Sequence, residues 1–218
     1  MPLDQIQNHI SSGANEQLAV ALKQSPEKAR LTTSMGVSLV TFAAYYRNLE
    51  AIRTIRAYLD DVTIHEACCI GELETVKEQL HKAPEVLNSF SADGFTPLGL
   101  ACFFGHVNLA AYLIETGADT NIAANNDFRV APIHSACAIW SVPIVNLLIA
   151  AGANVNLSQQ KGIRPIHSAS HNGSLEIVRI LIASGADHKI ADDSGKTPTD
   201  YALEKNYDEL VAYLKTLS

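Results

Sequence analysis

Three histidines have a spacing that could hold a metal ion. His167 and His171 are four residues apart, so a helix would present both imidazoles on one face, and His134 lies 33 residues before His167. Imidazole nitrogens are common ligands of zinc. The sequence fixes no Cys, Asp or Glu nearby as a further ligand, and a buried histidine is usually hydrogen-bonded instead. Binding of a metal or small ligand by His134, His167 and His171 is therefore kept as the alternative function.

Three of the four cysteines occupy one position of a repeating pattern, each directly after an alanine: Cys68, Cys102 and Cys137. Helices that pack side by side lie about 8–10 Å apart, which exceeds the roughly 7 Å between Cα atoms that a disulfide allows. We therefore predict that these cysteines are small buried apolar residues. Cys69 is expected to be more exposed and the first to react with an alkylating reagent.

No motif for catalysis is present. The chain has no glycine-rich phosphate loop, nucleophile elbow or HExxH sequence. Ser168 stands beside His167, but a catalytic triad is defined by geometry and not by sequence proximity. The sequence therefore predicts neither an enzyme nor a bound cofactor.

The composition argues against a nucleic-acid or membrane partner. Sixteen Lys and Arg against 23 Asp and Glu give a net charge of −7, the opposite of what a protein that grips phosphates needs. The longest apolar run, residues 109–114, is far shorter than the ~18 residues of a membrane span. The first ten residues lack the basic and then apolar segments of a secretory signal. We expect a cytoplasmic protein with reduced thiols.

The elements that carry these residues repeat. Proline recurs at Pro97, Pro132, Pro165 and Pro198, in steps of 35, 33 and 33 residues. Gly-Ala pairs recur in the same register at 117–118, 152–153 and 185–186, and between them apolar residues recur with helical spacing. Each unit is predicted to be two short antiparallel helices. Because such a unit is too small to bury its own core, the units must stack, which indicates one elongated domain.

The segments 93–119, 131–156 and 162–187 resemble ankyrin repeats, of the kind found in small bacterial ankyrin proteins. The resemblance implies an all-α solenoid of stacked helix-turn-helix units with short β-hairpin fingers. Residues 1–218 would form a single domain of about seven units. We assign residues 3–33 to a degenerate N-terminal cap, residues 34–60, 61–91, 92–124, 125–159 and 160–192 to five repeats, and residues 193–218 to a C-terminal cap. The unit that ends near Asp60 is about nine residues shorter than the pattern requires, so the next unit begins early.

The resemblance also implies a function, since ankyrin repeats bind partner proteins through a concave groove and the fingers. It places these residues at the groove and finger positions: Tyr45, Tyr46, Phe95, Phe103, Phe104, Phe128, Arg129, Val130, Ile139, Trp140, Ile163, His171 and Asn172. We expect a monomer that binds another protein, and one version of this function is the regulation of an enzyme. Ankyrin histidines at the position of His134 and His167 commonly brace the backbone between units.

Two departures from the pattern point to the middle of the groove. Trp140 stands where a glycine should end the helix, and because a tryptophan with positive φ is strained, we expect the helix to end by another route. Arg129 replaces the glycine found at Gly94 and Gly162, so its finger is expected to turn differently. We predict that Trp140 anchors the partner and that Phe128 and Arg129 set specificity. Alanine at Phe103 and Phe104 should weaken binding with little effect on stability.

Overall fold

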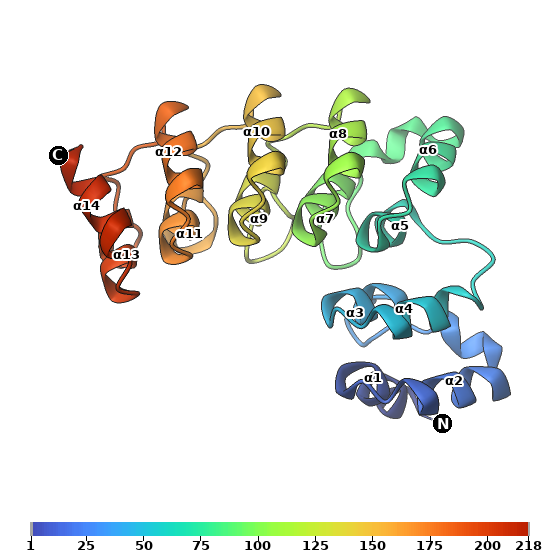
Figure 1. Cartoon of the computed structure of the whole chain (residues 1–218). Coiled ribbons are helices and arrows are strands. Elements are labelled where there is room, and N and C mark those ends of the chain that lie inside the picture. Colours follow the sequence, from blue (N-terminus) through green and yellow to red (C-terminus); the bar gives the residue numbers. More distant parts are fainter. Residues whose placement is uncertain (1, 218) are drawn as a thin grey trace.

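The computed structural model describes residues 2–217, which form a row of seven helix pairs (Figure 1). The helices are α1 Leu3–Ser12, α2 Asn15–Gln24, α3 Leu39–Tyr45, α4 Leu49–Arg56, α5 Ile64–Ile70, α6 Leu73–Lys82, α7 Pro97–Phe104, α8 Val107–Glu115, α9 Pro132–Ala138, α10 Val142–Ala150, α11 Pro165–His171, α12 Leu175–Ala183, α13 Pro198–Glu204 and α14 Asp208–Thr216. Short 3₁₀ turns cover Pro26–Arg30, Pro84–Asn88 and Gln160–Gly162. The predicted all-α solenoid is confirmed.

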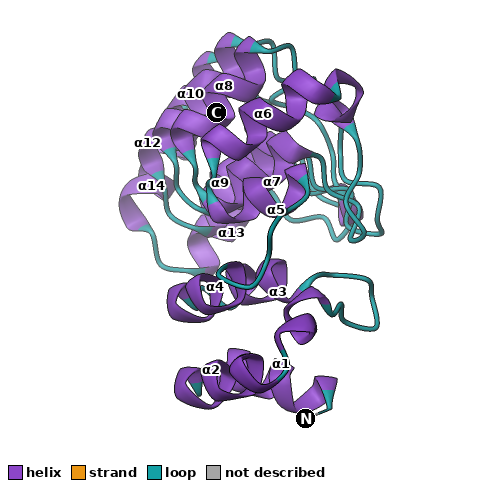
Figure 2. Cartoon of the chain, turned by 90° about the vertical axis from the view of Figure 1, so that its right-hand side faces the viewer, coloured by secondary structure: helices purple, strands orange, loops and turns teal. Residues whose placement is uncertain are grey.

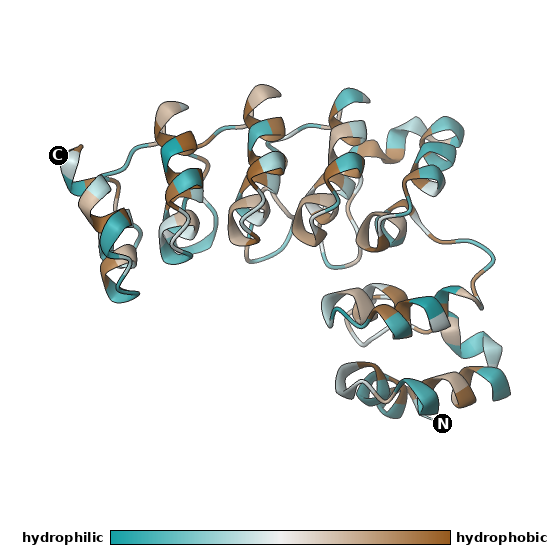
Figure 3. Ribbon diagram, viewed as in Figure 1, coloured by the Kyte–Doolittle hydropathy of each residue, from teal (hydrophilic) through white to brown (hydrophobic). Residues whose placement is uncertain are grey.

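The repeated residues form these elements for local reasons. Thr96 accepts a hydrogen bond from the backbone N–H of Gly99, which would otherwise lack a partner at the start of α7. Pro97 occupies the first turn, where its missing N–H removes no helical hydrogen bond. The central periodic apolar residues are fully buried, for example Ala110 and Leu113 in α8, and the outer ones, such as Val107 and Ile114, are partly buried against the same core. Figure 3 shows apolar and polar residues alternating along each helix. Each pair therefore buries one face against its neighbours, as the stacking argument requires.

The expected fingers are present as short hairpin turns that are closed by backbone hydrogen bonds but are too short to form strands. Residues 2–217 contain no strand, only one isolated antiparallel bridge between Thr32 and Ser38. Each finger is too short for a ladder. A single backbone hydrogen bond closes its base, as from Ser91 N–H to the Phe95 carbonyl at 2.9 Å.

The finger at residues 125–130 is two residues longer than its neighbours. The hydrogen bond from Ala124 N–H to the Val130 carbonyl encloses five residues, whereas the bonds from Ser91 to Phe95 and from Gln159 to Ile163 enclose three. Arg129 has φ 53°, in the same left-handed region as Gly94 at 86° and Gly162 at 70°. The finger therefore turns differently, as expected, although Arg129 keeps the left-handed backbone of the glycines at its position. Neighbouring fingers are also hydrogen-bonded, as from Asn125 N–H to the Gly94 carbonyl at 2.7 Å. This contact fixes the backbone path of the finger, and an arginine must adopt the conformation that a glycine has elsewhere.

The row bends sharply between the second and third pairs. Helices α1–α4 form an N-terminal block that is turned relative to the stack α5–α14, and α4 and α6 lie well apart in Figures 1 and 2. The link is short because no finger separates α4 from α5. An ion pair spans the bend, from Arg56 Nε to Glu72 Oε1 at 2.8 Å. The first helices α3, α5, α7 and α9 still pack in order along the bend.

Candidate functional site

Every helix pair is joined by a turn whose key residue has a left-handed backbone. Glycine takes this position in four pairs, with φ values of 72–81°, and asparagine takes it at Asn206. The two remaining turns hold Arg47, with φ 53°, and Trp140, with φ 59°. The expectation that Trp140 would avoid positive φ was therefore wrong. The left-handed conformation costs a residue with a Cβ about 1–2 kcal/mol, so both turns are strained.

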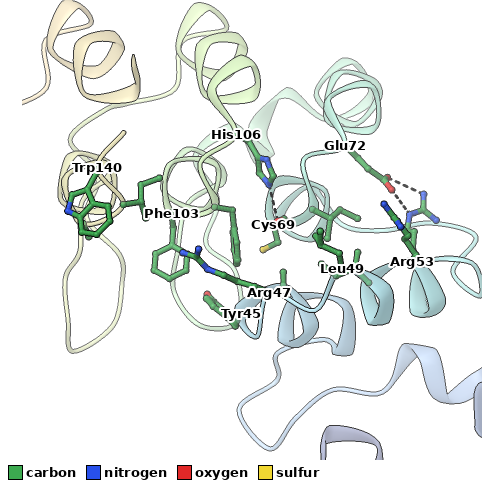
Figure 4. A pocket seen from close by; sticks show the side chains of 16 residues that line it. Tyr45, Arg47, Leu49, Arg53, Cys69, Glu72, Phe103, His106 and Trp140 are labelled. Carbon is green, nitrogen blue, oxygen red and sulfur yellow. Dashed lines mark hydrogen bonds and ion pairs between the residues drawn. The ribbon is translucent and has the colours of Figure 1, made fainter. Parts of the chain in front are cut away.

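Arg47 and Trp140 line the same pocket (Figure 4). The pocket has a volume of about 890 Å³ and lies inside the bend, between the N-terminal block and the ends of α5, α7 and α9. Figure 4 shows Trp140 at one end and Arg53 at the other, with the Arg47 side chain pointing toward Phe103. Trp140 is 60% exposed, an unusual value for the single tryptophan of the chain. The two strained turns thus flank one cavity.

An aromatic cluster forms part of the pocket wall. The ring of Tyr45 lies 5.6 Å from Phe103 and 5.3 Å from Phe104, centroid to centroid, and the two phenylalanines are 5.1 Å apart. Phe95 lies 6.4 Å from Phe103 and extends the cluster toward the fingers. Edge-on contacts at these distances are favourable for aromatic rings. The rings therefore stabilise one another as well as offering a surface.

The cluster is only partly exposed. Phe103 is at the margin of exposure, whereas Phe104 is half-buried and packs against the core. Tyr46 is exposed but points away from the pocket wall, with its ring 4.8 Å from Phe42. Phe103 and Phe104 thus differ in role, because truncation of Phe104 removes core packing. The expectation that both could be replaced without loss of stability does not fit the position of Phe104.

Tyr45 is fixed by a polar contact. Its hydroxyl donates a 2.6 Å hydrogen bond to Asp93 Oδ2, and Asp93 Oδ1 accepts one from the Ser91 hydroxyl. Burial first, and then the Asp93 carboxylate, raise the pKa of Tyr45. The contact connects α3 with the finger before α7, so it braces the pocket wall across the bend.

The pocket has a positive rim. Arg56 is paired with Glu72, but Arg47 and Arg53 are exposed and make no ion pair with any carboxylate in residues 2–217. Glu72 is the one carboxylate among the lining residues. In a chain with a net charge of −7, this part of the surface therefore has the opposite sign.

The thiols are closed off from solvent. Cys69 lines the pocket and is 3% exposed, whereas the other three thiols are fully buried, so it is the most exposed cysteine as expected but is still buried. That Cys69 reacts first stays a prediction. Its carbonyl contacts His106 Nε2 at 3.1 Å, and α7 covers the side chain. Burial raises the pKa of Cys69, as it does for Cys68, Cys102 and Cys137. The buried cysteines predicted from the repeat are confirmed. Because only the thiolate is a strong nucleophile, we expect all four to react slowly at neutral pH.

The histidines have structural partners. His167 Nδ1 accepts from the Arg164 N–H at 3.0 Å, so its Nε2 carries the proton and donates to the Ile190 carbonyl at 3.0 Å. His134 Nδ1 accepts from the Ala131 N–H in the same way. Burial lowers the pKa of both rings. The expected bracing of the backbone between units is confirmed for His167, which has no nitrogen left for a metal. It is not seen for His134, whose Nε2 is buried without a hydrogen-bond partner among residues 2–217.

The other predicted residues lie outside this pocket. A smaller cavity of about 290 Å³ continues the groove and includes Ile163, His171 and Asn172. Phe128 and Arg129 are exposed on their finger and Val130 is half-buried. Of the sequence-predicted set, the pocket brings together Tyr45, Phe103, Phe104, Ile139 and Trp140. Their role in binding stays a prediction.

Sequence reasoning missed the wall that the N-terminal block supplies. Arg47, Leu49, Ile52 and Arg53 all line the pocket, and Leu49 is 66% exposed. One signal was available, because Arg47 stands 34 residues after Gly13, at the same turn position. The others follow only from the bend, which the sequence pattern does not contain.

Comparisons with known proteins agree with the repeat pattern. A family model described as ankyrin repeats, in three copies, matches residues 64–159 and again 133–217. Human DNA-binding protein RFXANK is 38% identical over 73 residues, which is 34% of this chain and 28% of that protein. The probable 26S proteasome regulatory subunit p28 of Saccharomyces cerevisiae is 33% identical over 111 residues, 48% of this chain and 47% of that one. Mouse protein phosphatase 1 regulatory subunit 27 is 39% identical over 82 residues, which is 35% of this chain and 52% of that protein. The chain thus spans about half or less of the length of these relatives.

No helix within residues 2–217 has the length and apolar character to cross a membrane.

Proposed function

The chain belongs to the ankyrin-repeat family, and on this premise we propose that it binds another protein through the groove formed by its first helices. The pocket between Arg47 and Trp140 is the centre of the contact. Tyr45, Phe103 and Ile139 supply the apolar surface there, and the smaller cavity near His171 extends it. Phe128 and Arg129 on the long finger add specificity.

One observation carries this proposal: of the seven turns that join the described helix pairs, the two that hold neither glycine nor asparagine at the left-handed position both place their side chains in the lining of one pocket. Glycine would fit either turn at no steric cost. Strain of this kind persists where the side chain serves a function. Trp140 is also largely exposed, and tryptophan and arginine are the residues that most often dominate binding energy at protein interfaces.

The names of two relatives support a regulatory form of this function. They are a regulatory subunit of the proteasome and one of protein phosphatase 1. By analogy, the partner of this chain is an enzyme that it regulates without catalysing a reaction itself. Four free thiols suit a monomer that acts in the reducing cytoplasm.

Affinity capture from an extract of the native cell tests the proposal. The wild-type chain is compared with Trp140→Gly, Phe103→Ala and the control Val20→Ala, since Val20 is an exposed apolar residue on α2 outside the groove. The glycine variant relieves strain, so a loss of binding cannot be ascribed to unfolding. We expect about tenfold less partner on Trp140→Gly and an unchanged amount on Val20→Ala. Equal capture by all four chains would contradict binding through the groove. One zinc ion per chain, measured by elemental analysis, would instead support metal binding by the histidines.

A further inference from the structure

The charge of the pocket rim narrows the class of partner. The lining residues include Arg47, Arg53 and the Arg56–Glu72 ion pair, so the two unpaired guanidinium groups give the pocket a net positive charge. The rest of the chain carries the excess of carboxylates behind the total of −7. A positively charged pocket on a protein of net negative charge favours ligands that carry negative charge.

The positions of the two arginines make this charge part of the site. Arg47 holds a left-handed backbone at φ 53°, and Figure 4 shows its side chain pointing toward Phe103. Arg53 lies six residues further along, within α4, on the other side of the exposed Leu49 in the sequence. Neither guanidinium has an ion-pair partner within the described chain. Each is free to form a bidentate contact with an incoming carboxylate.

The geometry points to an acidic segment of a partner protein as the occupant of this pocket, with carboxylates on Arg47 and Arg53 and a bulky apolar side chain between Leu49, Phe103 and Trp140. The inference rests on the proposed function and names the chemistry of its partner. The apolar part of the pocket is complementary to a large hydrophobic group, and the positive rim is complementary to a negative charge beside that group. A nucleic acid is disfavoured, because a long polyanion would meet the net negative charge around the pocket.

The partner class can be tested without knowing the partner. A library of random dodecapeptides displayed on phage is selected on the full chain, and the enriched peptides are titrated while the fluorescence of Trp140 is recorded. Because Trp140 is the single tryptophan, a blue shift of its emission assigns a peptide to the pocket. The same selection is run on Arg47→Gln/Arg53→Gln and Arg47→Glu/Arg53→Glu. Arg179→Gln is the matched control, since Arg179 is exposed on α12.

We expect peptides that shift Trp140 emission to be rich in Asp and Glu beside an aliphatic or aromatic residue. The Gln double variant should bind them about fivefold more weakly, as expected for two exposed ion pairs, and the Glu double variant should select basic peptides instead. Affinity for the wild type should fall as NaCl rises from about 50 to about 500 mM, and Arg179→Gln should match the wild type.

Several outcomes would overturn the inference. Peptides that shift Trp140 emission but carry no excess of acidic residues would refute the acidic partner and leave the proposed groove function standing. Enriched peptides that never shift Trp140 emission would count against both, as would a selection with no enrichment. Tighter binding of fluorescent oligo(dT) than of any peptide would replace the acidic segment by a nucleic acid.

Discussion

Tyr45 and Asp93 are joined by a 2.6 Å hydrogen bond although 48 residues separate them. The bond ties the N-terminal block to the stack at the pocket wall. Tyr45→Phe removes the hydroxyl and leaves a half-buried carboxylate without this donor. We expect a loss of about 1.5 kcal/mol in the free energy of unfolding, measured by urea titration. Tyr46→Phe is the matched control, since no hydrogen bond from the Tyr46 hydroxyl reaches residues 2–217, and an equal loss in both variants would refute the role of the bond.

Glycine at the two strained turns should make the protein more stable. Trp140→Gly and Arg47→Gly each relieve a positive φ, and both side chains are exposed, so little packing is lost. The added chain entropy of glycine offsets part of the relief. We expect a gain of about 1 kcal/mol in each case by thermal or urea unfolding. The matched variant Asn206→Gly should gain less, because asparagine tolerates this conformation. A loss of stability in Trp140→Gly would show that the indole is a packing residue.

Stability should fall on mild acidification. Burial lowers the pKa of His134 to about 4, while an unfolded histidine titrates near 6.5. The unfolded chain therefore binds more protons between these values, and the free energy of unfolding falls as pH decreases from about 6.5 to about 4, by about 3 kcal/mol in total for this residue. His134→Gln keeps an acceptor for the Ala131 N–H and removes the titration. Its stability should depend less on pH in this window, whereas exposed His171→Gln should follow the wild type. Parallel curves for wild type and His134→Gln would contradict this assignment.

The thiols should react only when the chain opens. All four cysteines are buried and their pKa values are raised. We expect reaction with a thiol-reactive disulfide such as DTNB to be slow in buffer and complete in urea, since modification follows the population of opened states. Rapid modification of one thiol in the folded protein would show that Cys69 is accessible through the pocket.

The fold could be predicted because its determinants are local and repeated. Pro97 and its counterparts mark helix starts, and the apolar spacing around Leu113 marks the buried face, so each copy supports the same interpretation. The site was harder to predict. Trp140 makes the same backbone hydrogen bonds as its glycine counterpart Gly105, from Trp140 N–H to the Cys137 carbonyl and from Ser141 N–H to the Ala136 carbonyl, so the connection between the two helices overrode the local preference against positive φ.

The position of Cys69 shows the limit of reading one unit alone. Its neighbour in sequence, Cys68, faces the core, which by helical geometry would turn Cys69 toward solvent. It is covered instead by residues of the adjacent units, including the Thr41 side chain that contacts it. The half of the pocket formed by Arg47 and Arg53 depends in the same way on how two units are oriented, which no periodicity within a unit records.

The bend between α4 and α6 also determines how the array comes apart. In a linear array, stability is the sum of each unit's own contribution and its coupling to the next. At this boundary the second helices α4 and α6 lie well apart, whereas α8 and α10 pack together, so the coupling depends mainly on α3 with α5 and on polar contacts such as Arg56 with Glu72 and Tyr45 with Asp93. We therefore expect the N-terminal block to unfold separately from the stack α5–α14, and a ligand that contacts both walls of the pocket to make unfolding more cooperative.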